Sequence, residues 1–136
     1  MKLIVCLDDQ NGILFNGRRQ SRDSAVIQRI LALAQEQGVC MNAYSAKLFP
    51  HGAPGIRICN DLISTGEKNH WIFAENMDIT PYVQQIKLLV VFRWNRMYPA
   101  DLYFPMEILR SKLKLIRTRE FSGNSHSRIT EETYAL

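Results

Sequence analysis

The first 38 residues predict a strand, a charged loop and an amphipathic helix, in that order. Residues 3–7 are apolar, and residues 8–22 are polar and charged and contain an Asn-Gly turn pair. Over residues 23–37 apolar side chains recur at spacings of three and four, with Ser21 or Asp23 placed to cap the helix start and Gly38 just past its end. A strand that leads through a loop into a helix is the basic unit of α/β folds.

The same alternation continues along the chain. The predicted strands are residues 39–41, 56–59, 71–73, 86–94, 112–121 and 128–134. A short helical piece is expected after residue 41, through Ala46 and Phe49, and a second short helix over residues 80–85. Strands separated by helices predict βαβ units and a mostly parallel sheet, and the last two strands flank a turn at Ser122-Gly123-Asn124 that predicts an antiparallel hairpin. A chain of 136 residues is expected to form a single domain, residues 1–136.

The charge and the cysteine content indicate which partners and which cellular compartment the protein is expected to have. A net charge of +4 and a pI near 9.1 permit an anionic partner without requiring nucleic acid. The odd cysteine count, Cys6, Cys40 and Cys59, argues against a disulfide framework. The N-terminal apolar run is too short for a signal peptide, and no run approaches the roughly 18 apolar residues of a spanning helix, so we expect a cytoplasmic protein without a membrane partner.

The order and spacing of these pieces resemble dihydrofolate reductase over nearly the whole chain. Residues 71–105 (WIFAENMDITPYVQQIKLLVVFRWNRMYPADLYFP) are similar to the family's strand, diglycine turn, helix, strand and closing loop. Residues 39–49 (VCMNAYSAKLF) resemble its V-I-M-G-R-x-T-x-E-S-I element, and residues 3–17 resemble the first strand and the mobile loop after it. The resemblance implies an α/β, dihydrofolate-reductase-like three-layer fold with a mostly parallel central sheet and an antiparallel C-terminal hairpin.

Carried over residue by residue, the resemblance assigns a possible catalytic acid. Reductases use one carboxylate at the start of the first helix to bind the pteridine and support its protonation, and Asp23 falls on that position. Ile27 stands where an aromatic residue usually packs on the pteridine, and the family's Trp and Pro before the acid are replaced by RRQSR. The alternative is that Asp23 only caps the helix and faces its dipole.

The residues that would bind NADPH fit the family poorly. The diglycine, which lets the backbone approach the pyrophosphate, reads Ala74-Glu75, and a glutamate adds volume and a like charge. In the M-G-R-x-T element the glycine is Asn42 and the arginine that would bind the 2′-phosphate is alanine, whereas Ser45 keeps the hydroxyl. The adenosine-binding segment is reduced to residues 60–69, and Phe92 replaces the threonine that would bond the acid. These changes argue against NADPH-dependent reduction, and no cofactor is expected unless the resemblance outweighs them.

Three arginines beside the first helix suggest another use of the crevice. Arg18, Arg19 and Arg22 can form an anion site because guanidinium groups and free helix amides both favour phosphate or carboxylate, although a solvated basic loop is the simpler alternative. The leading hypothesis is a non-reductase protein that binds a small anionic or nucleotide-like ligand through these arginines and Ser45. A divergent dihydrofolate or pterin reductase using Asp23, and a phosphate-handling or RNA-associated protein, are the alternatives.

Other candidate chemistries have weaker patterns. Short bacterial proteins with a similar F-N-x-R-R-Q-S-R-D element have carried a ribonuclease Z label, but His51, His70 and His126 are scattered and predict no metal cluster. Asp8 and the adjacent acid could hold magnesium at a strand end, or be solvated loop residues. Ser21 and Ser45 lie in no G-x-S-x-G elbow, so the sequence does not predict a serine nucleophile.

Overall fold

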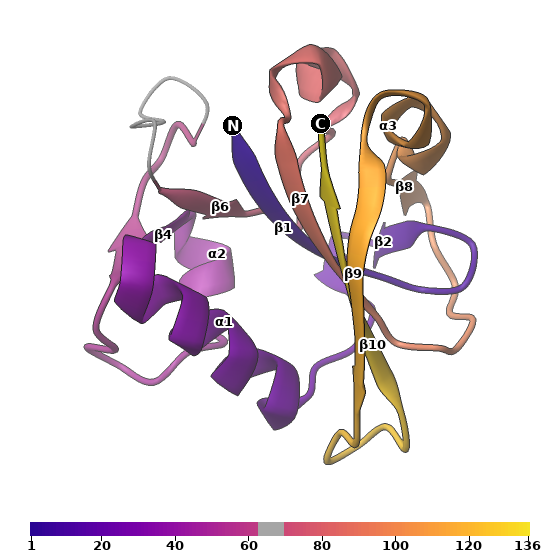
Figure 1. Cartoon of the computed structure of the whole chain (residues 1–136). Helices are drawn as coiled ribbons and strands as arrows, with labels where there is room; N and C mark the ends of the chain where they lie inside the picture. The colour runs from indigo at the N-terminus through magenta and orange to yellow at the C-terminus, as the bar shows by residue number, and fades with distance from the viewer. Residues whose placement is uncertain (63–69) are drawn as a thin grey trace.

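The computed structural model describes residues 1–62 and 70–136 and contains a seven-stranded sheet in the order β5-β4-β6-β1-β7-β10-β9 (Figure 1). The strands are β1 (Lys2–Leu7), β4 (Val39–Met41), β5 (Ile56–Ile58), β6 (Trp71–Phe73), β7 (Leu88–Arg93), β9 (Lys114–Phe121) and β10 (Ile129–Ala135). β1 pairs in parallel with both β6 and β7, whereas β10 pairs antiparallel with β7 and β9. The predicted α/β fold with a mostly parallel sheet and an antiparallel C-terminal hairpin is confirmed.

Two apolar cores cover the two faces of the sheet, because side chains alternate sides along each strand. Leu3 and Val5 of β1 pack with Leu109 of α3 (Met106–Lys112) on one face, which also holds side chains from the 3₁₀ helix η1 (Thr80–Gln85). Ile4 packs with Ile30 of α1 (Ser24–Gln37) on the other. Figure 1 shows α1 and the short α2 (Ala43–Ala46) on the opposite side of the strands from α3.

The helix α1 begins and ends where the sequence indicates. Asp23 is its N-cap, with extended backbone and a side chain that accepts from the Ala25 amide. Gly38 ends it at φ 78°, in the left-handed region that favours glycine, and its amide donates to the Ala34 carbonyl. In the part of the chain that the structure describes, no helix is long and apolar enough to cross a membrane.

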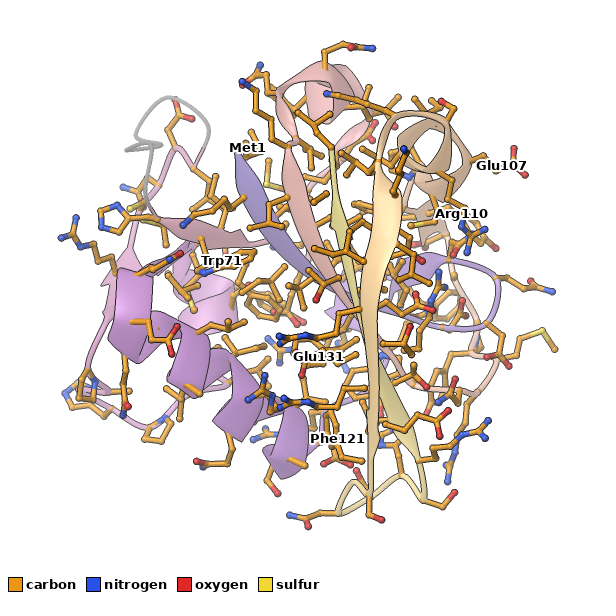
Figure 2. All side chains as sticks on the ribbon, viewed as in Figure 1. Met1, Trp71, Glu107, Arg110, Phe121 and Glu131 are labelled. Atoms are coloured by element: carbon orange, nitrogen blue, oxygen red, sulfur yellow. The ribbon has the colours of Figure 1, made fainter. Side chains whose placement is uncertain are left out.

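A salt bridge fastens α1 to the antiparallel part of the sheet. Arg29 donates from Nε and Nη2 to the two carboxylate oxygens of Glu131 on β10, at 2.8 and 3.0 Å. Figure 2 shows Glu131 between α1 and the strands, where the residue is only 4% exposed. The helix start is thereby fixed relative to the β9–β10 hairpin.

A second sheet and one helix were not predicted from the sequence. Residues 8–22, expected to be a loop, contain β2 (Gly12–Phe15) and β3 (Arg18–Arg19), which form a three-stranded sheet with β8 (Leu102–Tyr103). These strands are two to four residues long, too short for a period-two pattern to identify. α3 was also unpredicted, and most of the shortened segment 60–69 lies outside the described residues.

Candidate functional site

Asp23 joins the start of α1 to the turn between β9 and β10. Its Oδ1 accepts from the amides of Ala25 and Asn124, both at 2.9 Å. Its Oδ2 accepts from the amide and hydroxyl of Ser125 and from the amide and Nδ1 of His126, at 2.9 to 3.1 Å. A Cβ on Gly123 would lie 2.4 Å from Oδ2, so a residue without a side chain lets the turn approach the carboxylate.

The surroundings of Asp23 keep it ionised. Burial alone raises the pKa of the carboxyl, but hydrogen bonds from Asn124, His126, Ala25 and Ser125 together lower it far below its usual range. The structure confirms Asp23 as a helix cap, while its predicted catalytic role stays a prediction.

His126 connects Asp23 to two hydroxyl groups. Its Nδ1 lies 3.0 Å from Asp23 Oδ2, and its Nε2 lies 3.0 Å from both Ser21 Oγ and Tyr98 Oη. The indole of Trp94 stacks on the imidazole, with ring centroids 4.7 Å apart and planes at 24°. The hydrogen bonds therefore hold the two ring nitrogens in position, and the stacking on Trp94 sets the orientation of the ring plane.

Arg19 and Glu75, predicted to belong to different subsites, form an ion pair with each other. Arg19 donates from Nε to Oε2 at 2.9 Å and from Nη2 to Oε1 at 3.1 Å. The Ser45 hydroxyl donates to Glu75 Oε1 at 2.8 Å, and both Ser45 and Glu75 are buried. The Arg19 guanidinium also lies 4.3 Å over the Tyr44 ring. Desolvation opposes the charge of Arg19, but the hydrogen bond and charge of Glu75 outweigh it and raise the pKa of the guanidinium.

The remaining predicted cofactor positions surround this ion pair. Asn42 caps α2, accepting from the Ser45 amide at 2.9 Å, and donates to the Asn76 side chain at 2.7 Å. Ala74 is buried at the end of β6, and its amide donates to the Ile4 carbonyl of β1 at 3.1 Å. The structure thus brings Asn42, Ala74 and Glu75 together with Ser45 and Arg19.

Three adjoining hollows follow the segment of residues 18–22. The inner two, each with room for only about 10 Å³, share Cys6, Ser21, Glu75 and Trp94, and we call them together the crevice. The third, of about 330 Å³, shares Arg19 and Gln20 with the crevice and extends past Phe15 and Tyr98. Ligand pockets commonly have volumes of roughly 300 to 1,000 Å³, so the outer hollow could hold a small molecule, whereas each part of the crevice has room for about one water molecule.

Arg18 and Arg22 are exposed at opposite ends of this surface. Arg22 lines the inner hollow beside Asp23 and Ile27, and Arg18 lines the outer one. The predicted anion contacts are therefore of two kinds, because Arg19 is neutralised by Glu75 while Arg18 and Arg22 present charge to solvent.

One of the two paired acids after β1 has a structural use. Asp8 is 1% exposed and accepts from the amides of Gln10, Gly12 and Tyr98 and from the Gln20 side chain, at 2.7 to 3.1 Å. These bonds hold the first turn against the segments that border the crevice. Among residues 1–62 and 70–136 no group of three His, Cys, Asp or Glu side chains could hold a metal ion, and the ribonuclease Z label gains no support.

Sequence reasoning missed His126, Trp94 and Tyr98. His126 lies 103 positions from Asp23 and 105 from Ser21, so no local spacing could place them together. The small polar residues around Gly123 mark a turn, but not its contact with α1.

Comparisons with known proteins agree with the architecture. No protein-family model and no curated protein matches the chain. A solved dihydrofolate reductase from Enterococcus faecalis, in complex with NADP(H) and RAB-propyl, superposes with a TM-score of 0.72 at 11% identity, covering 98% of this chain and 94% of that one. An identity this low bears on the fold alone. The chain has a dihydrofolate-reductase-like fold.

Proposed function

We propose that this protein binds a small anionic or nucleotide-like ligand in the outer hollow, at the mouth of the crevice, and does not reduce it with NADPH. The observation that carries the proposal is the placement of the exposed Arg18 and Arg22 along adjoining hollows, with Arg19, paired to Glu75, between them. Guanidinium groups favour phosphate and carboxylate because their planar N–H donors match two oxygens at once.

The apolar and aromatic lining suits the rest of such a ligand. Trp94 and Ile27 border the inner hollow, and Tyr98 and Phe15 border the outer one. Phe15 is 46% exposed, which leaves its ring available to a flat group. An anionic molecule with an aromatic part would use both kinds of surface.

Glu75 supports the part of the proposal that concerns NADPH. By the resemblance it stands in the diglycine turn, where a pyrophosphate would need close backbone approach. Its buried side chain, bonded to Arg19 and Ser45, adds volume where that approach would be needed. The alternative of a divergent reductase is favoured by one observation, that Asp23 lines the inner hollow.

Thermal-shift titrations test the proposal directly. Nucleoside phosphates, dihydrofolate, NADPH and a short RNA would be titrated separately against the protein. We expect a rise in melting temperature with a small anionic ligand, and a reduced rise in Arg22→Ala and Arg18→Ala proteins. Arg117→Ala is the matched control, because Arg117 is exposed on β9 and lies outside the three hollows.

Three outcomes would contradict the proposal. NADPH oxidation coupled to reduction of dihydrofolate, lost in Asp23→Asn, would favour the reductase. An equal ligand-induced rise in melting temperature in the Arg22→Ala, Arg18→Ala and Arg117→Ala proteins would mean that Arg22 and Arg18 do not contact the ligand. Stabilisation by RNA alone would favour the RNA-associated alternative.

A further inference from the structure

Ser21, His126 and Asp23 stand in the order that serine hydrolases use to activate a nucleophile. Ser21 Oγ lies 3.0 Å from Nε2 of His126, and the opposite ring nitrogen, Nδ1, lies 3.0 Å from Asp23 Oδ2. In this arrangement the imidazole takes the serine proton while the carboxylate orients the ring. We propose that this protein transfers acyl groups, with Ser21 as the nucleophile and small anionic esters as the substrate class.

The hydrogen-bond pattern fixes which ring nitrogen carries the proton. Asp23 is ionised and can only accept, so Nδ1 of His126 must be the donor in that pair. Nε2 is then unprotonated in the neutral ring and accepts from a hydroxyl group. This is the tautomer that a general base acting on Ser21 requires.

Ser21 is placed between the base and the crevice. It is partly exposed and lines both inner hollows, whereas His126 is only 3% exposed behind it. A substrate that approaches from the mouth of the crevice would therefore meet Ser21 first, with the base shielded from bulk water. Arg22 lines the same inner hollow and is exposed, so its charge can attract an anionic ester to this end of the crevice.

Tyr98 completes a short chain of hydroxyl groups. Its Oη lies 3.0 Å from His126 Nε2 and donates to Ser21 Oγ at 3.4 Å. When Ser21 donates to Nε2, Tyr98 donates to Ser21 and holds its oxygen in place. Asp23 touches no substrate atom in this scheme and acts as a positioning residue.

The reaction balances without any added oxidant or reductant. Ser21 Oγ attacks the ester carbonyl carbon as its proton passes to Nε2, and the C–O bond to the leaving alcohol breaks as that proton moves to the alcohol. Water then attacks the acyl-serine, gives a proton to Nε2, and releases the carboxylic acid while Ser21 regains its proton. The inference rests on the proposed function in one respect, because the ester has to bind over the same set of hollows.

A fluorophosphonate probe tests the nucleophile without knowledge of the natural substrate. The probe forms an Oγ–P bond and releases fluoride, and peptide mass spectrometry identifies the modified serine. We expect Ser21 of the wild-type protein to react at least about 100-fold faster than Ser111. Ser111 is an exposed serine on α3 whose hydroxyl donates to the Ile108 carbonyl and not to a histidine. Equal reaction at Ser21 and Ser111 overturns the inference, and this comparison needs no variant.

Three variants separate the roles of the residues. Ser21→Ala abolishes labelling, Ser111→Ala leaves it unchanged, and His126→Gln lowers its rate by about 100-fold or more. Asp23→Asn lowers the maximal labelling rate while the half-saturating probe concentration stays the same, a split that loss of folding would not produce. Melting curves identify folded variants. Labelling of Ser21 at the wild-type rate in a folded His126→Gln protein would overturn the inference.

The two proposals can fail separately. Labelling of Ser21 without any anion-induced thermal shift would contradict only the binding function. An anion-induced shift that depends on Arg22, without labelling of Ser21, would overturn only the acyl-transfer inference.

Discussion

Arg19 and Glu75, 56 positions apart in the sequence, form an ion pair through two hydrogen bonds of 2.9 and 3.1 Å. The Glu75 side chain is 8% exposed and the Arg19 side chain 20% exposed, so water screens the pair weakly. The pair lies where three elements meet: the end of β6, α2 and the strand β3.

Removing the carboxylate should destabilise the protein. Glu75→Ala leaves Arg19 and the buried Ser45 hydroxyl without this acceptor, and we expect a loss of about 1 to 3 kcal/mol in the free energy of unfolding. Urea denaturation measures it. Glu107→Ala is the control, because Glu107 is exposed in the first turn of α3 and should cost less than about 1 kcal/mol (Figure 2). Equal losses would mean that the ion pair contributes nothing specific.

A gentler change at the same residue should alter ligand affinity. Glu75→Gln keeps the shape but removes the negative charge that neutralises Arg19. We expect the Kd for an anionic ligand to fall, because Arg19 then adds its charge to that of Arg18 and Arg22. Isothermal titration with the best anion from the thermal-shift series measures the change. An unchanged Kd would place the ligand away from Arg19.

Asp23 should make stability depend on acid pH. Because its pKa is lowered on folding, the stabilisation is complete above the unfolded pKa of about 3.9 and is lost as the pH falls below it. Wild-type stability should therefore decline between about pH 4 and pH 2, and Asp23→Asn should flatten this decline while lowering stability at pH 7 by about 1.5 to 3 kcal/mol. Urea midpoints across that pH range provide the measurement. Parallel pH profiles for the two proteins would contradict the assignment.

Removing only the arginine of the Arg29–Glu131 salt bridge should destabilise the protein more than replacing both residues with apolar ones. Arg29→Met leaves Glu131 ionised and nearly buried, which we expect to cost about 3 kcal/mol. The double variant Arg29→Met/Glu131→Leu removes the buried charge as well and should recover much of that loss. Calorimetric melting of the two variants tests the difference. A double variant as unstable as Arg29→Met would mean that packing, not the stranded carboxylate, sets the cost.

The sequence could predict the frame of this fold because its signals are local. The alternating apolar runs and the Asp23 and Gly38 caps depend on neighbours within one or two turns, and the structure reproduces those elements with small shifts at their ends. The short strands β2, β3 and β8 could not be found, because each is stabilised by partners far along the chain.

The candidate site was predicted only in part, for a related reason. The identities of Arg19, Ser45 and Glu75 marked them as unusual residues, but their mutual contacts depend on how β3, α2 and β6 meet. His126 gave no local signal at all, since its role comes from the turn that folds back onto Asp23. Contacts between charged groups that lie far apart in the sequence are determined by the fold, and the local spacing of residues does not predict them.

Gly123 provides a test of that long-range contact. A Cβ at this position would lie 2.4 Å from Asp23 Oδ2 and 2.8 Å from the His126 carbonyl, so Gly123→Ala must displace the turn from the helix start. We expect a loss of about 1 to 3 kcal/mol in stability. Because His126 moves with the turn, fluorophosphonate labelling of Ser21 should also fall in the folded variant. The loss of stability and the change in geometry can be measured separately. Well below the melting temperature the variant is folded, so the labelling rate there depends only on the position of His126. Wild-type labelling in a destabilised Gly123→Ala protein would mean that the turn is not what positions His126 against Ser21.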